Sequence, residues 1–126
     1  MLFELERQSS GQDYDIESIA YSLEQILPEH PSEAWNYIED SIQEHFIFRL
    51  GNMSILETNL NREAGNSEYA AKRAIYQKSS IHLTKDVAEQ YDAWDERKIA
   101  ARQKQLAKAA TSIWKIPFKP EMHRRN

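Results

Sequence analysis

Apolar side chains recur mainly at every second position in residues 21–28, and this spacing predicts a short β-strand. Pro28 ends the strand, because proline has no N–H to donate to a sheet ladder. A second apolar run, residues 53–56, follows a Gly-Asn turn signal. We predict that the two runs pair as a β-hairpin, with the first strand at residues 23–27 and a helix inserted between the strands.

Helical spacing accounts for most of the other apolar positions. We predict helices over residues 2–8, from Ser32 as N-cap through Phe46, over residues 68–78, from Thr84 as N-cap through Tyr91, and from Asp92 or Asp95 to Trp114. Pro117 and Pro120 prevent the last helix from continuing. The pattern as a whole therefore predicts a mainly α fold with one small β-hairpin.

Several residues in these segments are expected to be structural. The apolar stripe that begins at Trp35 should pack in the core, and Tyr69, Lys72 and Tyr76 share one face of their predicted helix. Arg102 is expected to pair with an acidic side chain.

Length and composition indicate one folded domain, residues 1–126, with residues 117–126 as a C-terminal tail. The chain is 40% hydrophobic and 29% charged, which is typical of globular proteins. It has no cysteine, so disulfides, thiolate metal sites and cysteine nucleophiles are excluded. No apolar run is long enough to span a membrane, and the N-terminus lacks the features of a signal peptide. We therefore expect a cytoplasmic protein without a membrane partner.

The net charge of −4 is distributed unevenly. Residues 1–48 carry one basic residue, Arg7, against eleven acidic ones, whereas residues 95–126 carry nine basic residues against three acidic ones. A basic C-terminal third can form a surface that faces phosphates, or it can simply be the solvated face of a helix. The charge alone leaves both readings open.

Two polar residues stand in the middle of the first predicted strand. Glu24 and Gln25 interrupt an otherwise apolar segment, and buried polar groups cost free energy unless something binds them. The partner can be a side chain, a metal ion or a substrate. For Glu24 the structural alternative is an ion pair with Arg49 or Lys72.

Several motifs follow one another along the chain. Residues 21–29 read Tyr-Ser-Leu-Glu-Gln-Ile-Leu-Pro-Glu, and residues 50–56 read Leu-Gly-Asn-Met-Ser-Ile-Leu. The later motif positions are Leu60, Asn61, Asn66, Tyr69, Lys72, Tyr76, Trp94, Ile99, Arg102, Leu106, Ile113 and Trp114. In order and spacing, these motifs resemble the C-terminal HNH-like (His-Me finger) domain of GmrSD-type, modification-dependent restriction endonucleases, over about residues 2–116. The resemblance implies a ββα-metal core embedded in helices.

The resemblance also implies a chemistry. HNH-type nucleases resemble single-metal phosphodiesterases that cut DNA, in which a divalent cation (Mg²⁺ or Mn²⁺) is held against the scissile phosphate. By this resemblance, Glu24 supplies the carboxylate ligand, Asn61 supplies the amide ligand, and Lys72 faces a phosphate oxygen. The family domain usually follows a larger N-terminal nucleotide-hydrolysing domain, which is absent from this chain. The chain is then a C-terminal fragment or a stand-alone remnant.

Gln25 departs from the family pattern at the position of the general-base histidine. A carboxamide cannot take a proton from water near neutral pH, and a positioned general base contributes roughly 10²–10⁴-fold in rate. We therefore predict an endonuclease domain that is weakened or inactive, with His30 and His45 as alternative bases.

Other readings remain open. A non-catalytic DNA- or protein-binding module on the same scaffold is the alternative function, and a purely structural helical domain is the third. Asn61 can simply cap the helix that follows it, and Asn52 is expected to form the turn that holds the hairpin.

Overall fold

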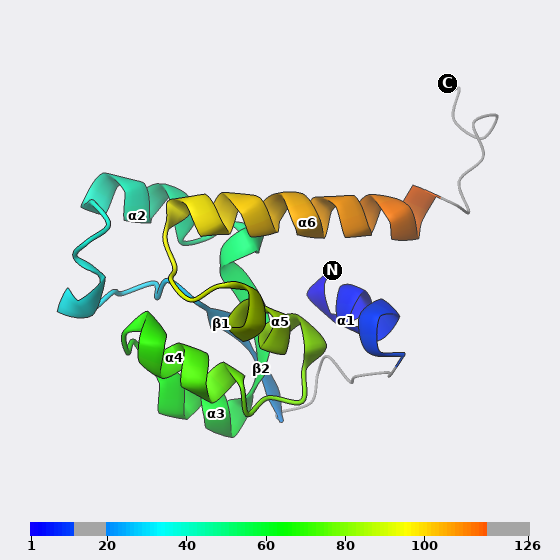
Figure 1. The fold of residues 1–126 in the computed structure, drawn as a ribbon, viewed down its shortest axis with the longest axis horizontal. Coiled ribbons are helices and arrows are strands. Elements are labelled where there is room, and N and C mark those ends of the chain that lie inside the picture. The colour runs from blue at the N-terminus through cyan, green and yellow to red at the C-terminus, as the bar shows by residue number, and fades with distance from the viewer. Residues whose placement is uncertain (12–19, 116–126) are drawn as a thin grey trace.

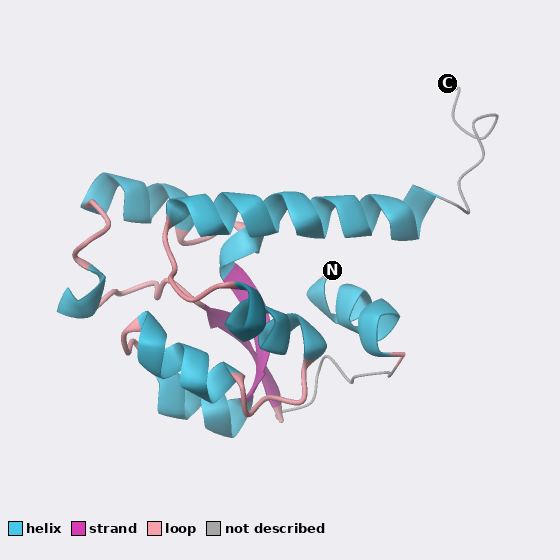
Figure 2. Ribbon diagram, viewed as in Figure 1, coloured by secondary structure: helices cyan, strands magenta, loops and turns pink. Residues whose placement is uncertain are grey.

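The computed structural model of the chain describes residues 1–11 and 20–115. Its elements are α1 (Leu2–Ser10), β1 (Tyr21–Gln25), the 3₁₀ helix η1 (Glu33–Trp35), α2 (Asp40–Phe46), the 3₁₀ helix η2 (Leu50–Asn52), β2 (Met53–Glu57), α3 (Thr58–Ala64), α4 (Tyr69–Tyr76), α5 (His82–Gln90) and α6 (Glu96–Lys115). Helices dominate, and the two strands form one small antiparallel sheet (Figure 2). The predicted fold class is confirmed, including the order of two strands and a helix (β1, β2, α3) that a ββα core requires.

The hairpin pairs Tyr21 with Glu57 at one end and Gln25 with Met53 at the other. This pairing confirms the predicted hairpin, although β1 ends at Gln25 and not at the expected Leu27. The strand pairing ends early because the side chain of Asn52 replaces a backbone partner: its Oδ1 accepts a hydrogen bond from the Leu27 N–H at 2.8 Å.

Helices cover the hairpin from several sides (Figure 1). The long helix α6 runs along one side of the molecule, whereas α3 and α4 lie together on the other side of the hairpin, and α1 lies near α5 and α6. The larger core cluster is built around Trp35, Tyr76 and Trp94, and the smaller one joins α1 to Ile55 of β2 and Leu106 of α6. In the described part of the chain, no helix combines the length and the apolar character that crossing a bilayer requires.

The single helix predicted from Ser32 to Phe46 is wrong, because the chain breaks it into η1 and α2. Between these two helices the buried side chain of Gln43 donates to two backbone carbonyls, Trp35 O at 3.0 Å, which also accepts from Ile38 N, and Ile38 O at 2.9 Å. The apolar stripe of this segment nevertheless packs in the core as expected.

The predicted N-cap of α5 is also wrong. The helix begins at His82, so Thr84 lies inside it and is buried. The N-terminus is capped from α1, where both carboxylate oxygens of the buried Glu6 accept backbone N–H groups, those of His82 and Leu83, at 2.8 Å each.

The start of α6 agrees with the predicted boundary at Asp95, whose Oδ1 accepts the N–H groups of Arg97 and Lys98 at 3.0 and 3.1 Å. The side chains of residues 113–115, Pro117, Pro120 and the predicted tail lie outside what the structure describes.

Candidate functional site

The carboxylate of Glu24 lies in the interior, against α4. Its Oε2 accepts from Lys72 Nζ at 2.9 Å and from the Tyr76 hydroxyl at 2.5 Å, and all three side chains are buried. Lys72 and Tyr76 are one helical turn apart, so they reach the same oxygen from one face of α4. The ion pair between Glu24 and Lys72 is one of the two pairs that the sequence left open as the structural alternative.

Lys72 has no N–H left to offer a ligand. Besides the carboxylate, its Nζ donates to the backbone carbonyls of Gln25 at 2.9 Å and Ile26 at 3.0 Å, and an ammonium group has three donors. Burial lowers the pKa of Lys72, and the charge and hydrogen bond of Glu24 oppose that shift. Burial also raises the pKa of Tyr76 well above its ordinary value, with Glu24 adding to the shift, so this hydroxyl stays a donor.

Both outer edges of the hairpin are covered by side chains instead of further strands. In each strand, the backbone N–H and C=O groups of the even-numbered residues point towards the partner strand. The bonds from Ile26 N to Asn52 O and from Thr58 N to Ala20 O show this pattern. The carbonyls of odd-numbered residues therefore point outward. The outward carbonyls with side-chain donors are Leu23 (from Asn61), Gln25 (from Lys72), Ile55 (from Thr84) and Met53 (from Arg102).

Asn61 reaches this edge from α3. Its Nδ2 donates to Ser22 Oγ at 2.7 Å and to Leu23 O at 3.1 Å. Because a carbonyl can only accept, the bond to Leu23 fixes the orientation of the amide and leaves Oδ1 without a hydrogen bond among the described residues. Since α3 begins at Thr58, the alternative that Asn61 is an N-cap is wrong.

The fold thus gathers three of the four predicted site residues, Glu24, Asn61 and Lys72, along one edge of β1, which we call the Glu24 edge. Asn61 and Lys72 bind carbonyls two residues apart on the strand, about 7 Å, on either side of Glu24. Ser22, the other partner of Asn61, points to the same face of the strand as Glu24.

Gln25 points to the opposite face of the strand from Glu24 and is partly buried. Its Nε2 donates to Ile47 O at 3.2 Å. The two alternative bases are both exposed: His30 lies beside Glu29, and His45 lies near the end of α2. Within residues 1–11 and 20–115, no hydrogen bond joins either histidine to Gln25.

The donor set at this edge suits a hard divalent cation that takes most of its ligands from water and phosphate. Glu24 Oε1 and Asn61 Oδ1 make no hydrogen bond in the described part of the chain, and carboxylate and amide oxygens are ligands for Mg²⁺. No group of three or more histidine, aspartate or glutamate side chains suited to a metal ion occurs among the described residues. Lys72 already neutralises Glu24, which weakens the attraction of this edge for a cation.

The sequence did not reveal how the neighbouring polar residues are used. The buried Asn52 makes four hydrogen bonds: Oδ1 accepts from Leu27 N and Trp94 Nε1, and Nδ2 donates to Leu27 O and Ile47 O. This agrees with its expected role in holding the hairpin. The Gly-Asn turn was the available signal, but Trp94 as a partner was not foreseeable.

Arg102 does not form the expected pair with an acid. Its guanidinium donates to the carbonyls of Gly51 and Met53 and to Ser54 Oγ, and no carboxylate lies within ion-pairing distance among the described residues. Burial lowers the pKa of Arg102 to about 10, although nearby tyrosines and Asp86 oppose the shift.

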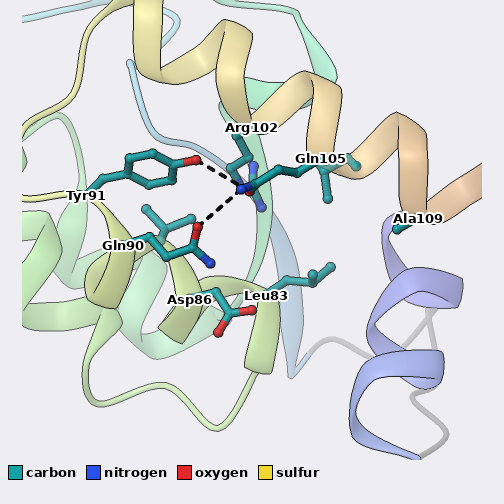
Figure 3. A pocket seen from close by; sticks show the side chains of 9 residues that line it. Leu83, Asp86, Gln90, Tyr91, Arg102, Gln105 and Ala109 are labelled. Carbon is teal, nitrogen blue, oxygen red and sulfur yellow. Dashed lines mark hydrogen bonds between the residues drawn. The ribbon is translucent and has the colours of Figure 1, made fainter.

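A separate cavity of about 140 Å³ lies between α5 and α6 (Figure 3). Its polar side chains bond to one another: Tyr91 Oη donates to Gln105 Oε1, and Gln105 Nε2 donates to Gln90 Oε1, each at 3.4 Å. Arg102 also lines it, on the β2 edge of the hairpin, so the cavity is not part of the Glu24 edge.

A family model described as GmrSD restriction endonucleases, C-terminal domain, matches residues 1–109. The chain belongs to this family. No curated protein and no solved structure matched the chain. Membership of the GmrSD C-terminal family makes this a restriction-endonuclease-related domain.

Proposed function

We propose that this chain is a metal-dependent DNA endonuclease domain of a restriction or defence system, acting in the cytoplasm and weakened or silenced at its general base. The observation that carries the proposal is the edge of β1, where Asn61 from α3 lies against the strand that bears Glu24, with one oxygen of each side chain uncommitted. Membership of the GmrSD family supports DNA as the substrate.

In this proposal, Glu24 Oε1 and Asn61 Oδ1 hold a Mg²⁺ or Mn²⁺ ion, which supplies charge stabilisation at the scissile phosphate. Tyr76 and Lys72 fix the Glu24 carboxylate through its other oxygen. We therefore assign Lys72 to holding Glu24, in place of the predicted contact with a phosphate oxygen, because its three N–H groups are already used.

Gln25 stands where the family has its base, and its amide can orient a water molecule but cannot accept its proton. We further propose that the N-terminal nucleotide-hydrolysing domain of the family, or a subunit equivalent to it, is the partner that selects the DNA.

The test is nicking of supercoiled plasmid with Mg²⁺ or Mn²⁺. We expect little or no cutting by the chain as it stands and a gain of roughly 10²-fold or more for Gln25→His, because the substitution supplies a group that can take the proton. Gln77→His, at an exposed position after α4, is the matched control and should stay inactive. Adding Asn61→Ala to Gln25→His should abolish the gain. A folded Gln25→His variant that binds DNA and remains inert would contradict the metal-site assignment.

The alternative function is a non-catalytic DNA- or protein-binding module. The observation that favours it is the buried ion pair, since Lys72 already satisfies the charge of the Glu24 carboxylate. This alternative predicts that isothermal titration calorimetry with Mn²⁺ detects no saturable binding to the protein. It also predicts that Glu24→Gln leaves the metal titration and the affinity for DNA unchanged.

A further inference from the structure

The outer face of α6 carries three cations in a line. Arg97, Lys104 and Lys108 are exposed and point to the same side, because residues seven and four positions apart nearly coincide around a helix. We call these three residues the α6 basic stripe. It extends from residue 97 to residue 108, about 16 Å along the axis.

Two of the three charges of the stripe, those of Lys104 and Lys108, form no ion pair in the described part of the chain. Arg97, whose side chain is 87% exposed, forms one long ion pair, with Asp95 at 3.8 Å. After Glu96, α6 contains no acidic residue. The exposed residues between the cations include Ala101 and Ala107, whose small side chains let an extended polyanion come close.

The opposite face of α6 fixes the helix to the hairpin. Ile99 and Leu106 are buried in the two core clusters, and Arg102 holds the β2 edge. The stripe is therefore presented on a rigid element, and little ordering of backbone is required when a ligand binds.

We propose that the α6 basic stripe binds the phosphate backbone of nucleic acid, as a contact separate from the Glu24 edge. A protein with net charge −4 needs a local concentration of positive charge to hold a polyanion, and the stripe supplies it. The proposal shares only its partner, DNA, with the proposed function.

The position of the stripe determines what it contributes. It faces away from the hairpin, whereas the Glu24 edge is covered by α3 and α4 on the other side of the molecule (Figure 1). Phosphates bound by the stripe are then not those at the cutting site. The stripe should raise affinity for DNA without changing the rate of cutting at saturation.

The experiment measures binding of a labelled DNA duplex in EDTA over a range of salt concentrations. We expect Lys104→Gln with Lys108→Gln to raise Kd roughly ten-fold at low salt and to reduce the slope of log Kd against log salt by about 2, one for each lost phosphate contact. The matched control is Lys78→Gln with Lys85→Gln, which makes the same charge change at exposed positions outside α6. Equal effects of the two double variants, or no effect of either, would overturn the proposal.

A second measurement separates this proposal from the nuclease proposal. In the Gln25→His background, the α6 double variant should raise the DNA concentration needed for half-maximal nicking and leave the saturated rate unchanged. A fall in the saturated rate would place the stripe at the cutting site and overturn the accessory role. If Gln25→His does not cut at all, the binding assay in EDTA still decides the role of the stripe.

Discussion

At the scale of single residues, the buried polar side chains of this protein share one task. A two-stranded sheet leaves outward carbonyls on both edges, and buried carbonyls must find donors. Lys72 and Thr84 supply two of those donors, and Arg102 supplies a third. Polar residues that suggest chemistry when read along the sequence are thus required by the hairpin itself. Glu24 differs from them, because one of its oxygens remains uncommitted.

Lys72→Met tests how strongly the buried pair contributes to stability. The substitution leaves the Glu24 carboxylate buried without a counter-ion, so we expect the free energy of unfolding to fall by about 3–5 kcal/mol. Urea denaturation gives the change. Lys78→Met removes an exposed pair with Glu63 and should cost less than about 1 kcal/mol. In the double variant Glu24→Gln with Lys72→Met, the loss should be smaller than in Lys72→Met alone. Similar losses of unfolding free energy for Lys72→Met and Lys78→Met would show that the buried pair contributes no more to stability than the exposed pair.

At the scale of elements, the helices are fixed to one another by contacts between residues far apart in the chain. Glu6 of α1 caps α5 across 76 residues, which docks the first helix against the fold. Gly51 in η2 touches the backbone of α6, where a Cβ would lie 2.2 Å from Ile99 O. The backbone of α6 therefore packs closely against η2 at Gly51, and the Gln103 side chain accepts a hydrogen bond from Gly51 N at the same contact.

Gly51→Ala should displace α6 from the hairpin. We expect a loss of at least about 3 kcal/mol in the free energy of unfolding, because the clash is with backbone and cannot be relieved by a rotamer change. The indole N–H resonance of Trp94, which donates to Asn52 next to this glycine, should shift as well. In Gly65→Ala the added Cβ meets open space, so only the backbone strain of a side chain at φ +49°, about 1–3 kcal/mol, and no shift at Trp94 are expected. A Trp94 resonance that does not move in folded Gly51→Ala would contradict this close packing.

At the scale of the whole molecule, the hairpin lies between two core clusters, and its end at Glu57 is hydrogen-bonded to the chain segment between α4 and α5. There the carboxylate of Glu57 accepts from Ser79 Oγ at 2.7 Å and from Ser80 N at 2.8 Å. Burial raises the pKa of Glu57, but these hydrogen bonds outweigh burial and hold it below its ordinary value of 4.5.

This lowered pKa makes the stability of the whole protein depend on pH in acid. A carboxyl with a lower pKa in the folded state than in the unfolded state contributes stability above the unfolded value, near pH 4.5, and the contribution is lost as pH falls through the folded value. The difference in free energy of unfolding between the unsubstituted chain and Glu57→Gln should therefore be present at neutral pH and vanish as pH falls well below 4.5. Urea denaturation across this range measures it. Glu68→Gln, at an exposed position with no described side-chain hydrogen bond, should show no such dependence, and a pH-independent effect of Glu57→Gln would refute the coupling.

The sequence by itself determined the features that depend on neighbours along the chain. The hairpin and the shared face of Lys72 and Tyr76 follow from local periodicity, and the order of the motifs was enough to identify the family. The prediction that Gln25 stands at the position of the general base also comes from the sequence alone.

Tertiary structure decided which groups meet. Glu6 caps α5 in place of Thr84, Arg102 binds carbonyls instead of an acid, and Lys72 pairs with Glu24. Each of these outcomes depends on contacts between segments dozens of residues apart. Periodicity determines which side of an element is buried, but not which donor reaches an unpaired carbonyl. That choice depends on how the packed elements bring distant side chains to the edges of the hairpin.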